Sequence, residues 1–202
     1  MATSLRVSAL PLALGALLLG SCSSNPGKPA PADLESIPPQ GAEAAVVYTL
    51  PASLPIRNFL PITERVVGGG PPSAETIAEM KSLGYSTIIN MRTSGEAGVA
   101  EEAELAAAAG LHYVHIPISG ATTNLRNAMA LSQALEGAPE GKVLLHCGSG
   151  NRVGAMWGLK EAIENGLDAD TASQVARRSG MRSASLEARV RSSIATAQAA
   201  RD

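Results

Sequence analysis

The sequence predicts an α/β domain built on a central, mostly parallel sheet flanked by helices. Short apolar segments with strand character alternate with segments of helical periodicity from about residue 65 to residue 165, a pattern typical of parallel strands covered by helices. The last third of the chain is expected to be helical. With 202 residues, 45% of them hydrophobic, but only 1 Trp, 3 Tyr and 1 Phe, the chain supports one core made mainly of aliphatic side chains.

The expected strands are short and apolar, and the expected helices repeat apolar residues three or four positions apart. We expect strands at residues 65–67, 86–91, 112–116 and 142–146. We expect helices at residues 74–83, 101–109, 125–136, 153–165, 169–178 and 186–199. A glycine and proline turn at residues 68–72 follows the first strand, and Ser73 is a suitable N-cap for the first helix. Gly84 and Gly110 are expected to end the first two helices.

The first 22 residues have the features of a secretory signal rather than of a membrane span. Arg6 precedes an apolar run at residues 7–19, which is shorter than the roughly 20 residues that cross a bilayer. The run ends in Leu19-Gly20-Ser21-Cys22, which resembles a bacterial lipobox. We therefore expect a signal peptide at residues 1–21, acylation of Cys22, and export to the periplasmic side of a bacterial membrane. The alternative is an ordinary cleaved signal followed by an incidental cysteine.

Residues 22–55 are expected to form a tether between the lipid and the folded domain. The stretch is rich in Ser, Pro, Gly and Ala, and its prolines prevent regular structure. Residues 44–50 are ambiguous, because they suit either a strand or an ordered arm. The folded α/β domain is then expected at residues 56–202.

Charge and cysteine content narrow the choice of partners. The formal net charge of −2 gives no attraction to nucleic acid, so we expect none, and contact with a membrane is expected only through the lipid. The chain has 2 Cys, and acylation would consume Cys22. Cys147 then has no disulfide partner, and it is either a buried inert thiol or a reactive one.

Cys147 lies where an apolar strand passes through a turn of small residues into a helix. In α/β sheets this is the usual place for a ligand. Gly148 and Gly150 let the backbone curl so that N–H groups point inward, and Ser149 and Asn151 complete the loop. Because the following helix adds the positive end of its dipole, we expect residues 148–151 to bind an anion.

A thiol at the rim of such a loop ionises more readily, which makes Cys147 a candidate nucleophile. Arg152 could clamp two oxygens of a bound oxyanion with its planar guanidinium. His146 precedes the cysteine, and we expect it to tune the thiolate from the opposite side of the strand end rather than to act as a general base. The alternative for Cys147 is a buried thiol in a strand-to-helix turn.

The loop from Cys147 to Arg152 resembles the signature of cysteine-dependent phosphatases and of rhodaneses. Four segments of the chain, at residues 58–73, 87–92, 115–118 and 146–154, are also similar to the beta-lactamase-hydrolase-like, phosphatase-like domain, which is related to dual-specificity phosphatases. The resemblance covers about residues 56–166. It implies a protein-tyrosine-phosphatase-like fold, a phosphocysteine or cysteine persulfide intermediate, and neither metal nor other cofactor.

The chain departs from the tyrosine and dual-specificity phosphatase pattern in three ways. Four residues separate Cys147 from Arg152, which is the rhodanese spacing, whereas those phosphatases have five. Val153 stands where those phosphatases have a Ser or Thr that helps the thiolate leave. They also carry an upstream Asp as general acid, but the chain has none between Asp33 and Asp168.

Candidate replacements for the missing acid are Glu96, Glu101 and Glu102, each of which is otherwise a surface carboxylate. Arg92 either lines the pocket or is an exposed residue at a strand end. A metal site has no support, because His112 and His115 are expected on opposite faces of a strand.

Three functions remain open. The first is a cysteine-dependent phosphatase that acts on a small phosphorylated substrate or a phosphoprotein. The second is a rhodanese-type sulfurtransferase that takes sulfur from a small donor through a Cys147 persulfide. The third is a module that binds phosphate or sulfate groups without turnover.

Overall fold

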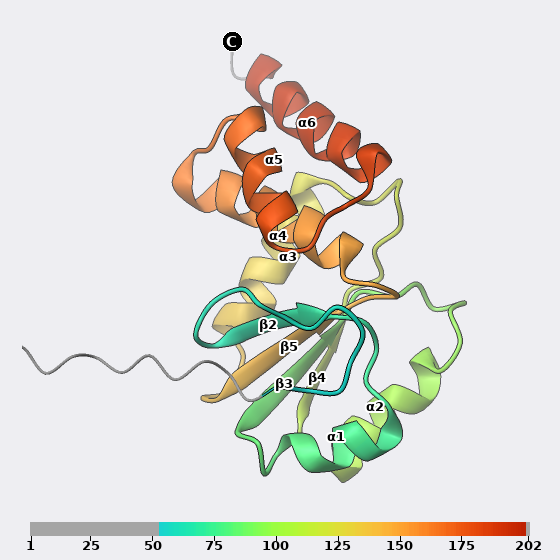
Figure 1. Ribbon diagram of the computed structural model, residues 1–202. Helices are drawn as coiled ribbons and strands as arrows, with labels where there is room; N and C mark the ends of the chain where they lie inside the picture. Colours follow the sequence, from blue (N-terminus) through green and yellow to red (C-terminus); the bar gives the residue numbers. More distant parts are fainter. Residues whose placement is uncertain (1–52, 201–202) are drawn as a thin grey trace, which may run out of the picture. The chain divides into compact units, whose positions relative to one another are not determined.

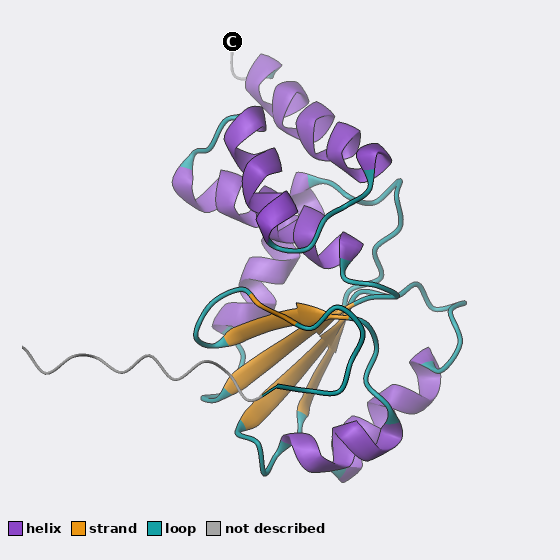
Figure 2. Cartoon of the chain, viewed as in Figure 1, coloured by secondary structure: helices purple, strands orange, loops and turns teal. Residues whose placement is uncertain are grey.

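The structure is a computed structural model that describes residues 53–200. The expected signal peptide, Cys22 and the ambiguous segment at residues 44–50 lie outside the described residues. Figures 1 and 2 show an α/β arrangement in which helices cover both faces of one sheet. The predicted fold class is therefore confirmed.

The sheet contains five strands in the order β1-β2-β5-β3-β4. The strands are β1 (Leu60–Pro61), β2 (Val66–Gly69), β3 (Tyr85–Asn90), β4 (His112–His115) and β5 (Lys142–His146). β2, β5, β3 and β4 are parallel, whereas β1 is antiparallel to β2. The sequence does not predict β1, which has two residues and is too short to give a periodic signal.

The described residues form six helices (Figure 1). They are α1 (Ala74–Met80), α2 (Val99–Ala108), α3 (Leu125–Glu136), α4 (Asn151–Asn165), α5 (Ala169–Arg178) and α6 (Ala184–Ala199). α1 and α2 pack on one face of the sheet and enclose a core that includes Val67, Ile88 and Leu144. The other four helices belong to a second core on the opposite face, where Ile89 and Leu145 point. Adjacent strand residues serve opposite cores because side chains alternate along a strand.

Polar side chains fix three helix starts where the sequence predicts them. Ser73, Asn124 and Asp168 each accept a hydrogen bond from the backbone N–H three residues later, at 3.2, 3.0 and 2.7 Å. α1 ends three residues earlier than expected, and α2, α4 and α6 each begin two residues earlier. β2 continues through Gly69, so two residues of the expected turn are strand. Leu54, assigned to the tether by sequence, is buried in the core, so the predicted domain start at residue 56 is too late.

Close helix packing fixes the position of α4, which carries Arg152. A Cβ atom on Gly154 would lie 2.3 Å from the backbone nitrogen of Met181, and one on Gly158 would lie 2.6 Å from the carbonyl oxygen of Ala172. Glycine at these two positions therefore lets α5 and the turn after it lie directly against the α4 backbone.

The sheet register aligns the strand ends around β5. His146, the last residue of β5, pairs with Gly69 on one side and with Asn90 on the other. The loops that follow β2, β3 and β5 therefore leave the sheet at the same level. Over residues 53–200 the structure contains no helix with the length and apolar character of a membrane span.

Candidate active site

Cys147 follows β5 directly and lies under a tight loop. Its side chain is buried, and its backbone N–H donates to the carbonyl of Gly69 at 3.2 Å, so the cysteine is fixed to the end of β2. Gly150 has φ +83° and caps the N-terminus of α4, a conformation that favours glycine. The N–H of Gly150 points back to Sγ of Cys147 at 3.1 Å. A hydrogen bond to the sulfur stabilises its ionised form.

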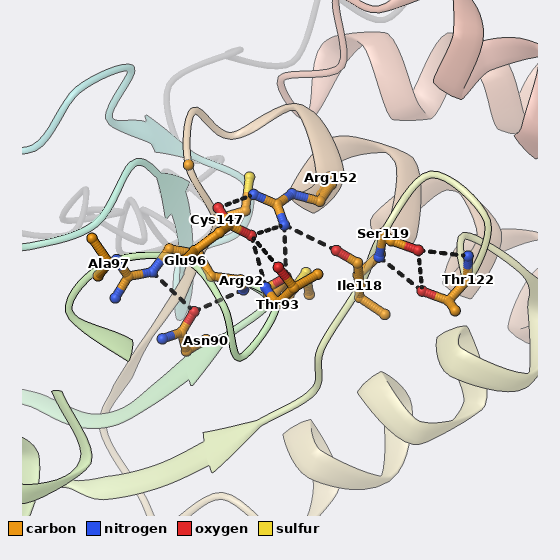
Figure 3. A network of polar contacts seen from close by, with 12 residues as sticks. Asn90, Arg92, Thr93, Glu96, Ala97, Ile118, Ser119, Thr122, Cys147 and Arg152 are labelled. Carbon is orange, nitrogen blue, oxygen red and sulfur yellow. Dashed lines mark hydrogen bonds and ion pairs between the residues drawn. The ribbon is translucent and has the colours of Figure 1, made fainter. Parts of the chain in front are cut away.

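Arg152, in the first turn of α4, directs its guanidinium across the loop. It donates to both oxygens of Glu96, from Nη1 to Oε1 at 2.6 Å and from Nη2 to Oε2 at 2.8 Å (Figure 3). Nη1 also donates to the carbonyl of Ile118 at 2.9 Å. A Cβ atom on Gly148 would lie 3.3 Å from Nη2 and 3.5 Å from Oε2, so the Arg152–Glu96 pair lies against the loop backbone. Glycine at 148 leaves room for this close approach, and its φ is not positive.

A turn after β3 places Glu96 at the loop. The N–H of Glu96 donates to the carbonyl of Thr93, and the N–H of Thr93 donates to Oε1 of Glu96 at 2.7 Å (Figure 3). Bonding to Arg152 lowers the pKa of Glu96 to about 2. The bond to Glu96 also raises the pKa of Arg152, and the neighbouring Cys147 acts in the same direction. A cation, a carboxylate and a sulfur atom thus meet at one loop.

A second cluster of charged side chains lies on the other side of the end of β5, opposite Cys147. Nε2 of His146 donates to Oε1 of Glu102 at 2.7 Å, and Nη2 of Arg92 donates to Oε2 of the same carboxylate at 2.7 Å. Arg92 is also bonded to the side chain of Asn90 and to two backbone carbonyls. All four side chains are buried. Among the described residues, Nδ1 of His146 has no hydrogen-bond partner.

This buried group changes two expectations from the sequence, those for Arg92 and Glu102. Arg92 neither lines the pocket nor is exposed, because it neutralises Glu102 inside the protein. Glu102 is not a surface carboxylate and does not reach the loop, and Glu101 is exposed on α2. Of the three candidate acids, only Glu96 contacts Arg152. His146 lies on the side of the strand opposite Cys147, as expected, and its predicted tuning of the thiolate stays a prediction.

The remaining predicted loop residues have different roles. Oδ1 of Asn151 accepts from the N–H of Arg182 at 2.6 Å, and Nδ2 donates to Oγ of Ser149 at 3.2 Å. Asn151 therefore ties the loop to the connection between α5 and α6, and its side chain does not point at Arg152. Val153 is fully buried and packs close to Gly68. It occupies the position of the phosphatase Ser or Thr, but here the side chain is part of the core.

Sequence reasoning missed Arg57 and Asn58, which lie on the outer side of the loop. Nη2 of Arg57 donates to the carbonyl of Gly148, and Nδ2 of Asn58 donates to the carbonyl of Ser149 at 3.0 Å. Asn58 is part of the run that resembles the phosphatase-like family, but its type alone does not indicate a contact 91 residues away. The two bonds connect the segment before β1 to the anion loop.

The described residues contain no set of side chains suited to binding a metal ion. Across residues 53–200, no group of three or more His, Cys, Asp or Glu side chains is arranged to hold a metal ion. His112 is exposed, whereas Nε2 of His115 donates to the carbonyl of Arg92 at 2.7 Å.

Comparison with known proteins points to phosphatases. The family described as "Beta-lactamase hydrolase-like protein, phosphatase-like domain" matches residues 62–164, just over half of the chain. A Beta-lactamase hydrolase-like protein of Xylella fastidiosa is 33% identical over 117 residues, which is 56% of this chain and 27% of that protein. The protein of the same name from Agrobacterium fabrum is 35% identical over 107 residues, 51% of this chain and 25% of its own length. The chain thus spans about a quarter of the length of these relatives.

Solved structures with the same fold include several phosphatases. A DUF442 protein of Shewanella putrefaciens gives a TM-score of 0.56 at 17% identity, covering 71% of this chain and 94% of that one. TpbA of P. aeruginosa gives 0.53 at 19% identity, with 74% and 93% covered. The catalytic domain of the PP-IP phosphatase SIW14 from S. cerevisiae gives 0.52 at 16% identity, with 70% and 88% covered. At these identities the likeness shows the fold alone.

The two kinds of comparison agree with the site geometry. A buried cysteine after the central strand, an arginine in the first turn of the next helix and a match over residues 62–164 all occur in one domain. The chain belongs to the family of Beta-lactamase hydrolase-like protein, phosphatase-like domains, and it has the fold of the cysteine-dependent phosphatases related to protein tyrosine phosphatases.

Proposed function

We propose that the chain is a cysteine-dependent phosphatase in which Cys147 is the nucleophile. The observation that supports this most directly is the arrangement around Cys147. Its buried sulfur accepts the N–H of Gly150 at 3.1 Å, while the guanidinium of Arg152 lies against the same loop. Stabilising donors are thereby placed both at the thiolate and where the oxygens of a phosphoryl group would bind.

The reaction has two steps. The thiolate of Cys147 attacks phosphorus, the bond from phosphorus to the ester oxygen breaks, and the leaving group departs with that electron pair. Water then attacks the phosphocysteine, the sulfur–phosphorus bond breaks, and phosphate leaves as the thiolate is restored. Arg152 binds two oxygens of the phosphoryl group in both steps. Its planar guanidinium donates two parallel hydrogen bonds to such an oxyanion, as it does to the carboxylate of Glu96 in the structure.

Glu96 is our proposed general acid, although it is ionised while paired with Arg152. An incoming phosphoryl group would take over the guanidinium and place negative charge next to the carboxylate. Loss of the cation and gain of a like charge both raise a carboxyl pKa, so Glu96 would take up a proton as substrate binds. It could then give that proton to the departing alkoxide.

Sulfur transfer is the second candidate, favoured by the spacing of the loop. Only four residues separate Cys147 from Arg152, as in rhodaneses, and a smaller ring suits a smaller group. In this reaction the thiolate takes the outer sulfur of thiosulfate, sulfite leaves, and cyanide removes the sulfur from the persulfide as thiocyanate. Val153, which offers no hydroxyl to a departing thiolate, is compatible with slow turnover of a phosphocysteine.

Steady-state assays on two substrates test the proposal. We expect the purified chain to hydrolyse an aryl phosphate, whose leaving group needs little protonation, and to lose that activity in Cys147→Ser. Cys22→Ser is the matched control, because it removes the other cysteine and should leave turnover unchanged. The same proteins are assayed with thiosulfate and cyanide. Thiocyanate formation without phosphate release would favour the sulfurtransferase, and oxyanion binding without either turnover would favour a binding module.

We further propose that the chain is exported and held at a bacterial membrane by a lipid on Cys22, facing the periplasm. The support is the apolar run that ends in Leu19-Gly20-Ser21-Cys22. The substrate would then be a small phosphorylated molecule or a phosphoprotein on that side of the membrane. Mass spectrometry of the mature N-terminal peptide tests the anchor, which is absent if Cys22 carries no acyl chains.

A further inference from the structure

The segment of Arg57 and Asn58 contacts the anion loop from outside. Its contacts are made to two consecutive backbone carbonyls, those of Gly148 and Ser149, and both donors are side-chain nitrogens. The segment is itself held in place, because the N–H of Gly70 donates to the carbonyl of Arg57 at 2.7 Å. Both side chains are exposed, so neither contact is explained by the packing of a core.

The backbone of this segment is unusual. Among the described residues, Asn58 is the one residue other than glycine with a positive φ, at +54°. Asn tolerates this left-handed conformation better than most residues, but it is still less favourable than an ordinary backbone. A Cβ atom on Gly69 would lie 2.6 Å from Cδ1 of Ile56 and 3.3 Å from the carbonyl oxygen of Arg57, so glycine at the end of β2 lets the segment approach closely. A strained residue next to a reactive group suggests a functional role.

Planarity of the peptide bond links Asn58 to the sulfur of Cys147. In a trans peptide the C=O and the following N–H point in opposite directions. Peptide bonds in the described part of the chain are trans. Holding the carbonyl of Ser149 outward therefore holds the N–H of Gly150 inward, and that N–H donates to Sγ of Cys147 at 3.1 Å. The hydrogen bond from Asn58 also polarises this peptide, which strengthens its N–H as a donor.

We propose that Asn58 is a positioning residue for the nucleophile, which it orients and stabilises through the peptide between Ser149 and Gly150. Arg57 does the same for the preceding peptide, since its bond to the carbonyl of Gly148 turns the N–H of Ser149 toward the side on which the oxyanion binds. The inference rests on the proposed role of Cys147 as nucleophile. It adds that two residues before β1, far from the loop in sequence, set the reactivity of the thiol.

Other charged groups also act on Cys147 and are unchanged by a substitution at Asn58. On α4 the guanidinium of Arg152 faces the thiol, with Glu96 from the loop after β3 bonded to it. On the opposite side of the strand lie His146 and its partner Glu102 from α2. Because these groups stay in place and Asn58→Gly adds no charge, a change in thiol reactivity in that variant reports on the peptide alone.

Replacement of Asn58 by glycine is the main test. Glycine adopts positive φ without strain, so Asn58→Gly removes the side-chain donor and keeps the backbone path. The measured quantity is the alkylation rate of Cys147 by iodoacetamide as a function of pH, followed on the peptide that contains Cys147. We expect the midpoint of this profile to move up by about one pH unit, because a hydrogen bond that favours the thiolate is weakened. We also expect kcat at neutral pH to fall more than KM changes.

Asn58→Asp is the second variant, nearly identical in size and equally tolerant of positive φ. Its carboxylate cannot donate to the carbonyl of Ser149 and adds a negative charge near the thiol, so the midpoint should rise at least as far as in Asn58→Gly. Arg57→Gln should produce a smaller rise, because its peptide does not reach the sulfur. Urea midpoints equal to that of the unmodified chain confirm that the variants are folded.

The proposal is overturned if Asn58→Gly and Asn58→Asp have the alkylation profile of the unmodified chain, whether or not activity falls. Alkylation needs no turnover, so this result is separate from the fate of the proposed function. The chain could show no hydrolysis of any substrate while the alkylation midpoint still moves in the variants. In that case Asn58 positions a reactive thiol, and only the phosphatase assignment is wrong.

Discussion

Two arginine–glutamate pairs lie on opposite sides of the end of β5, and they differ mainly in burial. In the inner pair, Arg92 and Glu102 are 2.7 Å apart with 8% and 3% of their side chains exposed. In the outer pair, Arg152 and Glu96 are 2.6 Å apart with 18% and 32% exposed. Both glutamates follow β3. The inner pair contacts His146 through Glu102, and the outer pair lies beside Cys147 (Figure 3).

Burial and the number of partners give the pairs different roles. Both oxygens of Glu102 are used inside the protein, one by Arg92 and one by His146, so no ligand can replace the carboxylate. Glu96 holds Arg152 at the surface, where an oxyanion could replace it with similar bonds. The inner pair therefore supports the strand end, and the outer pair is the one that can exchange partners during a reaction.

The largest expected effect is on stability, from breaking the inner pair. Glu102→Gln leaves the buried guanidinium of Arg92 without a counter-charge, and loss of one partner of a buried pair costs about 3–5 kcal/mol. We expect the free energy of unfolding, measured by urea denaturation, to fall by about that amount. Glu101→Gln is the matched control, because Glu101 is the exposed neighbour on the same helix. Equal stability of the two variants would mean that the inner pair does not support the fold.

The next effect is on ligand binding, from opening the outer pair. Glu96→Gln keeps the size of the side chain but removes the charge that competes for Arg152. We expect inhibition by inorganic phosphate to become stronger by about threefold to tenfold, which corresponds to roughly 0.7–1.4 kcal/mol. Competitive inhibition constants measured at neutral pH check this. Weaker inhibition in the variant would show that Glu96 helps to bind the anion and does not compete with it.

The smallest effect is the pH dependence of the outer pair. Glu96 has a pKa of about 2 in the folded protein against an ordinary value of 4.5, so its contribution is fully present above about pH 4.5 and is lost as the pH falls toward 2. Partial exposure limits the contribution to about 1 kcal/mol or less. We expect the stability difference between the chain and Glu96→Gln to shrink over this range. A difference that grows on acidification would contradict the assignment of the low pKa.

The comparison also shows what a sequence can and cannot predict. The strand and helix periodicities predicted the fold class, and the resemblance of four segments between residues 58 and 154 predicted the family. Burial of Glu102 and Arg92 could not be predicted, because the two residues are ten positions apart in a polar stretch and only the pairing of β3 with β5 brings them next to His146. The roles of Arg57 and Asn58 were missed for the same reason.

Predictions were more accurate where a single residue type determines the local backbone. Ser73 caps the first helix as expected, and Gly150 has the positive φ that a tight loop needs. Gly68 and Gly69 misled the prediction of a turn, because glycine is needed there for close packing inside a strand rather than for chain reversal. A glycine run gives the same sequence signal in both cases.

The mass of Cys147 during turnover is the most direct test of the central claim. The chain is mixed with an aryl phosphate, quenched in acid within one turnover, digested, and analysed by mass spectrometry on the peptide that contains Cys147. The account predicts one added phosphoryl group on that cysteine, absent in Arg152→Ala and in the chain without substrate. An added sulfur atom after incubation with thiosulfate, with no phosphoryl adduct from any phosphate ester, would contradict it.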